Sequence, residues 1–167
     1  IYSMRTNHEI DYRIYGEELQ FVEIELDPNE TAIAESGAFM MMDNDIQMQT
    51  IFGDGSQQQG GGLLGKLFSA GKRLLVGESL FMTAFTNTGQ GKKRVSFAAP
   101  YTGKIIPFDL QQLGGKIIAQ KDAFLCAAKG VSIGIEFQRK LGTGIFGGEG
   151  FIMEKLEGDG LAFAHAG

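Results

Sequence analysis

Apolar and polar residues alternate along most of this chain, a pattern typical of β-strands that bury one face. Between residues 9 and 26 the alternation predicts a hairpin whose apolar side consists of Ile10, Tyr12, Ile14, Val22, Ile24 and Leu26. Strands elsewhere are equally short, and turn residues such as glycine, asparagine and aspartate separate them. The pattern therefore predicts an all-β fold, either a sandwich or a barrel.

One stretch departs from the strand pattern. Residues 53–62 are rich in glycine and glutamine and predict a mobile loop. Residues 63–75 then repeat apolar side chains at helical spacing, with basic side chains on the opposite arc, which predicts one short amphipathic helix. The helix offers a candidate surface for a protein partner or a membrane, formed by Leu63, Leu64, Lys66, Leu67, Phe68, Lys72 and Arg73. Packing against its own sheet or another subunit is the simpler use of such a helix.

The chain repeats itself. Residues 38–48 align without gaps on residues 123–133, and two further matches follow in the same order, 77–82 on 148–153 and 95–98 on 161–164. Collinear matches of this kind indicate a duplicated structural unit. We expect residues 1–110 to hold the N-terminal hairpin and the first β repeat, and residues 111–167 to hold the second.

The second repeat is shorter than the first at its C-terminal end. The first continues beyond residues 95–98 through Pro100 into another strand, at residues 103–106, which Pro100 and Pro107 should bracket. The second has only three residues after the matching segment. We therefore expect residues 161–166 to form an edge strand, covered by another subunit, by residues missing from this chain, or by the N-terminal segment 1–8.

Composition and charge narrow the function classes. The chain has 167 residues, with 15 basic and 20 acidic side chains and a formal net charge of -5, so it has no general attraction for nucleic-acid phosphates. Its single cysteine, Cys126, lies in an apolar run and is expected to be a buried small hydrophobe. No apolar run is long enough to span a bilayer, and the N-terminal residues lack the order of a signal peptide, which favours a cytoplasmic location.

Two glycine-rich stretches resemble nucleotide-binding motifs but lack the necessary context. Residues 60–66 end in lysine, as a phosphate-binding loop does, yet Leu67 stands where a hydroxyl should hold magnesium. Residues 142–147 match the dinucleotide fingerprint, yet the pattern that follows is a strand and not a helix. Both are interpreted as structural loops.

Candidate catalytic groups are scarce. The two histidines are His8, near an end expected to fray, and His165, expected in the core or at an interface. No nucleophile with a nearby base and no transition-metal ligand set can be assembled from them. We expect no catalytic residues, no metal and no cofactor.

Several stretches resemble the mitochondrial biogenesis family, which is named for altered inheritance of mitochondria. They are residues 77–82, 122–127, 148–153 and 158–167, and the resemblance extends from Tyr12 to the end of the chain. Asn29 stands where the family more often has glycine, in a turn. The resemblance implies a prokaryotic member whose tandem units are like the trp RNA-binding attenuation protein, a short-stranded β-sandwich or double-stranded β-helix. It implies no catalytic residues, and mitochondrial relatives are associated with inner-membrane organisation.

These observations favour a non-catalytic assembly or scaffold protein that self-associates and presents residues 63–75 to a protein or a membrane. Two alternatives stay open. RNA binding follows only from kinship of fold with an RNA-binding protein, and the acidic balance makes nucleic acid an unfavourable partner. A small ligand inside the sandwich would need an apolar cavity with a few convergent polar groups.

Overall fold

The computed structural model describes residues 4–54, 81–139 and 151–167. These residues form thirteen strands and two single turns of 3-10 helix, and every strand pairing is antiparallel, which confirms the predicted all-β class. The predicted amphipathic helix at 63–75 and most of the predicted mobile loop lie outside the described residues. The elements are β1 (Asp11–Tyr15), β2 (Phe21–Leu26), β3 (Thr31–Ala34), η1 (Ser36–Ala38), β4 (Phe39–Met42), β5 (Ile46–Phe52), β6 (Phe81–Asn87), β7 (Lys93–Ala98), β8 (Lys104–Asp109), β9 (Lys116–Gln120), η2 (Lys121–Ala123), β10 (Phe124–Ala128), β11 (Ser132–Arg139), β12 (Phe151–Glu157) and β13 (Leu161–Ala166).

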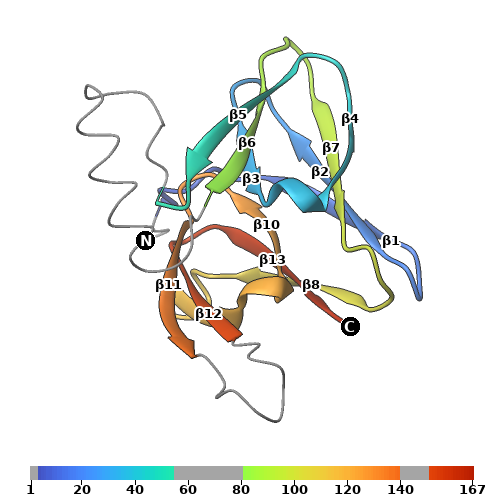
Figure 1. Ribbon diagram of the computed structural model, residues 1–167. Helices are drawn as coiled ribbons and strands as arrows, with labels where there is room; N and C mark the ends of the chain where they lie inside the picture. The colour runs from blue at the N-terminus through green and yellow to red at the C-terminus, as the bar shows by residue number, and fades with distance from the viewer. Residues whose placement is uncertain (1–3, 55–80, 140–150) are drawn as a thin grey trace, which may run out of the picture.

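The strands form three sheets (Figure 1). Sheet A has the order β1-β2-β7-β4, sheet B the order β5-β6-β3-β10-β13-β8, and sheet C the order β11-β12-β9. One buried apolar cluster joins residues of sheets A and B, and a second joins residues of sheets B and C. Sheet B is therefore the middle layer and is covered on both faces.

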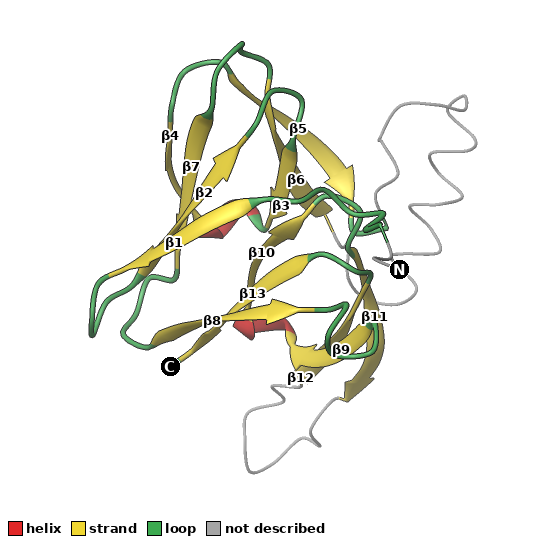
Figure 2. Ribbon diagram, turned by 180° about the vertical axis from the view of Figure 1, so that it is seen from behind, coloured by secondary structure: helices red, strands yellow, loops and turns green. Residues whose placement is uncertain are grey.

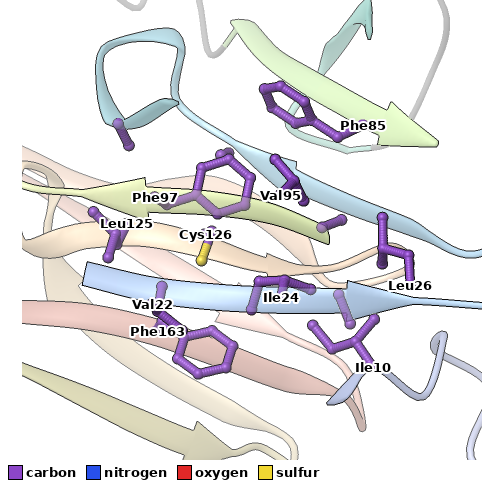
Figure 3. Packing of buried hydrophobic residues seen from close by; sticks show 14 of the residues in the cluster. Ile10, Val22, Ile24, Leu26, Phe85, Val95, Phe97, Leu125, Cys126 and Phe163 are labelled. Atoms are coloured by element: carbon purple, nitrogen blue, oxygen red, sulfur yellow. The ribbon is translucent and has the colours of Figure 1, made fainter. Parts of the chain in front are cut away.

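Strand β3 shows how the middle layer is built. All four of its residues are buried, and its side chains alternate between the two cores, with Ala32 and Ala34 in the first and Ile33 in the second. The first core is lined by Val22, Ile24, Phe97 and Phe163 among others, and Figure 3 shows strands of two layers directing these side chains toward one another. A strand covered on both faces cannot follow the apolar–polar alternation of the outer strands.

The two sequence repeats are two copies of one strand arrangement. In the first unit, β2-β7-β4 faces β5-β6-β3; in the second, β8-β13-β10 faces β11-β12-β9, in the same order. A 3-10 turn precedes the corresponding strands β4 and β10, and both carry a bulge at the same position, after Phe39 and after Phe124. The units meet where β3 pairs with β10, so the middle sheet contains half of each unit.

One of the three sequence matches is displaced by one residue. In the first unit Met42 lies opposite Val95. Its equivalent in the second unit, Ala127, lies opposite Ala162, whereas the sequence match of 95–98 with 161–164 would place it opposite Leu161. A shift of one residue turns a side chain to the other face of a sheet. Phe163 thereby points toward sheet A, where its ring meets Tyr12 edge to face at 4.9 Å, instead of into the second core.

The expectation that β13 would be an edge strand is wrong. β13 pairs with β10 on one side and with β8 on the other. β8 lies in the range 1–110, which the repeat pattern assigns to the hairpin and first repeat, but its only strand partner among the described residues is β13. Pro107 does not end this strand but lies within it, opposite Phe163, because β8 is an edge strand and one of its sides needs no donor.

The N-terminal segment is held in place, so the expectation that it frays at His8 is also wrong. Asp159 accepts hydrogen bonds from the backbone N–H groups of Thr6 and Asn7, at 2.6 and 2.8 Å. Asn7 Oδ1 accepts in return from the N–H groups of Asp159 and Gly160, both at 2.8 Å. Residues 5–8 therefore form a strap across the turn that precedes β13 (Figure 2).

His8, the last residue of the strap, contacts both units at their junction. Its N–H donates to the Lys129 carbonyl at 3.0 Å, and its Nδ1 accepts from the Thr31 N–H at 3.0 Å. These two groups belong to opposite units, so His8 closes the end of the β3–β10 ladder. Burial, and then the charge of Lys129, lower the pKa of His8 below its ordinary value of 6.5.

This contact makes stability depend on pH. Because the folded-state pKa of His8 is depressed, its contribution is complete above about pH 6.5 and is lost as the pH falls through the lower folded value. We expect the free energy of unfolding of the wild-type protein to fall more between pH 7.5 and pH 5 than that of a His8→Gln variant. Glutamine keeps a hydrogen-bond acceptor but does not titrate, so the difference reports the protonation of one side chain. Urea unfolding at both pH values measures the difference. Equal losses in the two proteins would contradict the assignment.

Asp159 adds a second step at lower pH. The N–H groups of Thr6 and Asn7 lower the pKa of its carboxyl below 3.8, so its contribution is present above that pH and disappears below it.

Candidate functional site

The residues that the sequence proposed as an interaction surface, Leu63 to Arg73, lie outside the described residues, as do both glycine-rich motifs. Cys126 is buried in the first core, as expected, and burial raises the pKa of its thiol well above the ordinary value. His165 is also buried, and its ring meets Tyr101 edge to face at 4.8 Å. His165 is therefore in the core, as expected, while His8 contacts Thr31 and Lys129, so the two histidines are not brought together.

Within residues 4–54, 81–139 and 151–167, no cluster of histidine, cysteine and carboxylate side chains could hold a metal ion. In the same ranges no helix has the length and apolar character needed to cross a bilayer. A hollow of about 300 Å³ lies between the β1–β2 turn and the start of β8, lined by Glu17, Glu18, Thr102, Gly103 and Lys104. Its lining is polar and charged, unlike the apolar cavity expected for a ligand inside the sandwich.

The most distinctive surface feature of the described residues is the free edge of β4. β4 ends sheet A and pairs only with β7, and its side chains Met40, Met41 and Met42 are 46%, 48% and 38% exposed. The corresponding residues of the second unit, Leu125, Cys126 and Ala127, are 3%, 0% and 0% exposed, because β10 pairs with β3, Leu125 and Cys126 lie in the first core and Ala127 lies in the second. The same structural position is thus an interface in one unit and open surface in the other.

The opposite end of the molecule has a matching open edge. β9 corresponds to β3, ends sheet C and pairs only with β12 among the described strands. Ile118 on β9 is 47% exposed, whereas its counterpart Ile33 is 2% exposed. A sheet edge with apolar side chains is a template for pairing with another strand.

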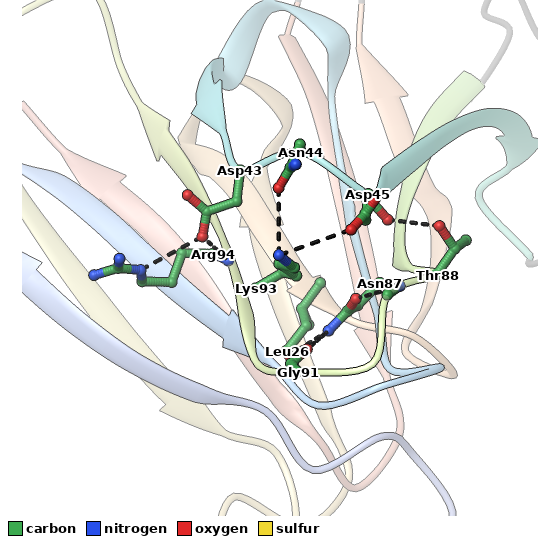
Figure 4. Close-up of polar contacts among 10 residues, drawn as sticks. Leu26, Asp43, Asn44, Asp45, Asn87, Thr88, Gly91, Lys93 and Arg94 are labelled. Carbon is green, nitrogen blue, oxygen red and sulfur yellow. Dashed lines mark hydrogen bonds and ion pairs between the residues drawn. The ribbon is translucent and has the colours of Figure 1, made fainter.

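The β4–β5 turn fixes the position of the β4 edge (Figure 4). Asp43 accepts from the Arg94 N–H at 2.9 Å and pairs with the Arg94 guanidinium at 3.6 Å. The carbonyl of Asp45, a residue with a φ of 66°, accepts from the N–H and hydroxyl of Thr88 at 2.9 and 2.7 Å. Lys93 adds contacts to Asn44 and Asp45 at 3.3 and 3.8 Å. The edge is therefore held in an extended form before any partner binds.

The edge of β8, by contrast, is protected. Pro107 removes one donor from it, and the Ile105 N–H is taken by Gln20 Oε1 at 2.7 Å. Proteins commonly use proline and side-chain contacts of this kind to prevent edge pairing. β4 and β9, two of the other five end strands, carry no proline, and within the described residues each has a strand partner on one side alone.

Sequence reasoning missed this surface. The signal was available in the gapless repeat, where three consecutive methionines in one unit align with Leu125, Cys126 and Ala127 in the other. Methionine is adaptable and is common at binding surfaces. Without the β3–β10 pairing, however, nothing in the repeat indicated that these positions face a neighbouring unit.

The described residues define a duplicated antiparallel β-sandwich in which β4 and β9 end their sheets. The chain belongs to the mitochondrial biogenesis AIM24 family, whose sequence pattern matches residues 12–167. No curated protein matches the chain. A crystal structure of a Streptococcus pyogenes protein, determined as a structural genomics target, is similar with a TM-score of 0.67 and 20% sequence identity. The match covers 95% of this chain and 65% of that chain, and the bacterial source fits the expected prokaryotic member.

Proposed function

We propose that this chain is a non-catalytic assembly protein that binds other protein chains by β-strand addition at its open edges. The single observation that carries the proposal is the exposure of Met40, Met41 and Met42 on β4, at positions that are buried in the second unit. In strand addition, backbone hydrogen bonds supply affinity and flanking side chains supply selectivity.

RNA binding has less support. Six basic side chains of the described residues form ion pairs with carboxylates: Arg5, Lys92, Lys93, Arg94, Lys116 and Lys155. RNA binding at a groove requires a run of basic side chains that are free to contact phosphates. The ion pairs oppose such a run, and the net charge of -5 adds to the repulsion.

A photoreactive amino acid at position 41 tests the proposal in cells that express the protein. We expect irradiation to give a discrete covalent adduct whose second component is a defined protein, identified by its peptides. Leu19, an exposed apolar residue in the β1–β2 turn, provides the matched control position. Equal labelling at positions 41 and 19, or no adduct at either position 41 or position 118, would refute the proposed function.

A further inference from the structure

The junction between the two units is a β3–β10 ladder, and the counterparts of both strands are open. β10 corresponds to β4 and β3 corresponds to β9, so one molecule presents both halves of the junction that it already contains once. We propose that a second copy of this chain supplies the missing neighbour, with β4 of one copy pairing antiparallel with β9 of the next. This inference rests on the proposed function and names its partner.

The repeat fixes the register of this pairing. Residues 31–34 correspond to 116–119, and residues 38–43 to 123–128, both with an offset of 85 positions. Within the chain, Cys126 lies opposite Ala34, Ala127 opposite Ile33, and Ala128 opposite Ala32. The same register between copies pairs Met41 with Ala119, Met42 with Ile118 and Asp43 with Ile117.

Backbone directions on β4 agree with this register. At the junction, Lys129 N–H donates to the carbonyl of Thr31, directly opposite, so the alternation of the ladder makes Ala127 and Ile33 the next hydrogen-bonded pair. In β4, the Asp43 N–H donates inward to the Arg94 carbonyl at 2.8 Å. The N–H and C=O of the preceding residue, Met42, therefore point away from β7 and toward the open edge. Ala127, the equivalent of Met42, directs its own N–H and C=O toward β3 in the same way.

Backbone directions on β9 agree independently. The Gly158 N–H donates to the Gly115 carbonyl at 3.0 Å, at the start of the β9–β12 ladder. Alternation then directs the polar backbone groups of Ile117 and Ala119 toward β12 and those of Ile118 outward. Met42 and Ile118, which the register pairs, are thus the residues whose donors and acceptors face the two open edges.

Side-chain volume also fits, and charge does not oppose the register. Lys116 corresponds to Thr31 and falls opposite Asn44 of the neighbouring copy, although Lys116 already pairs with Glu136, and the flanking Asp43 and Asp45 already pair with Arg94 and Lys93. Met40 and Met41 take the positions of Leu125 and Cys126, which the first unit buries. Pairing would extend sheet C of one copy into sheet A of the next, as the two halves of sheet B already join within the chain.

Proline substitutions test the proposal without disturbing the ladders inside the molecule. Ile118→Pro and Met42→Pro each remove one outward N–H from an edge strand, where proline is tolerated. We expect light scattering to show wild-type chains associating as concentration rises, and each variant to weaken association about tenfold or more. Ile118→Val, which keeps the donor, should associate like wild type. Circular dichroism and thermal unfolding confirm that each variant is folded.

Mixing the two proline variants makes the test specific. Met42→Pro keeps an intact β9, and Ile118→Pro keeps an intact β4. Each alone should therefore stay monomeric, whereas an equimolar mixture should form a one-to-one dimer and nothing larger, as read by native mass spectrometry. Dimers of Ile118→Pro alone would mean that β4 pairs with β4, which overturns the proposed pairing.

The outcomes separate this inference from the proposed function. Monomeric wild-type protein at every concentration, together with an adduct at position 41 to a different protein, would overturn self-pairing and leave the assembly role standing. Monomeric protein with no edge adduct at all would overturn both. Self-association that Ile118→Pro and Met42→Pro leave unchanged, in folded proteins, would place the contact elsewhere and also reject the pairing.

Discussion

Replacing Phe97 by alanine is expected to lower the free energy of unfolding by about 3 to 5 kcal/mol. Phe97 is completely buried in the first core, and its ring meets Phe85 edge to face with centroids 5.1 Å apart. Truncation removes its apolar contacts and leaves a cavity between sheets A and B that rigid strands cannot fill. Urea unfolding followed by circular dichroism measures the loss.

Phe81 provides the matched control for this truncation. It is 44% exposed at the start of β6, where its ring lies against Phe52. The same change to alanine there should cost about 1 kcal/mol or less, because part of the ring is already in water. Similar losses at the two positions would mean that the first core does not dominate stability.

Replacing Asn87 by alanine is expected to cost about 2 to 4 kcal/mol, although the change removes only a polar group. Asn87 is fully buried, and its Nδ2 donates to the carbonyls of Leu26 and Gly91 at 2.8 and 2.7 Å. Its Oδ1 accepts from the Gly89 N–H at 2.9 Å. Alanine leaves these three backbone groups without their partner, in a position that water reaches poorly. Thermal and urea unfolding report the effect.

Asn44 lies in the adjacent turn and serves as the comparison. Its side chain is exposed and its Oδ1 accepts from Lys93 Nζ at 3.3 Å (Figure 4). Asn44→Ala should therefore change stability by about 0.5 kcal/mol or less. If Asn87→Ala proved as mild as Asn44→Ala, the turns at 27–30 and 88–91 would not depend on the buried amide.

Substitutions in the core, such as Phe97→Ala, should affect assembly differently from the proline substitutions at the edges. Phe97 lies on β7, the only strand partner of β4 in the described residues, so its loss should weaken association by weakening the fold itself. Met42→Pro and Ile118→Pro should weaken association while the fold persists. Stability and association measured on the same samples therefore distinguish a damaged edge from a damaged core.

The sequence by itself determined the class of fold and the duplication of the strand pattern. Alternating apolar residues specify which side of an outer strand is buried, since side chains in a strand point to opposite faces in turn. The alternation of Val22, Ile24 and Leu26 predicted their place in the core correctly. The gapless match of residues 38–48 with 123–133 likewise predicted two equivalent segments, which became β4–β5 and β10–β11.

Only the tertiary structure decided which strands lie beside one another. Pairing of β8 with β13, and of β3 with β10, joins residues far apart in the chain, and local periodicity carries no information about such neighbours. The solvent exposure of equivalent residues depends on this pairing. Cys126 and Met41 occupy the same position in their units, but within the described residues only Cys126 has the neighbouring strand β3 to cover it. The positions of β4 and β9 at the ends of their sheets, and hence the proposed interaction surface, follow from how the units pack and not from any motif within them.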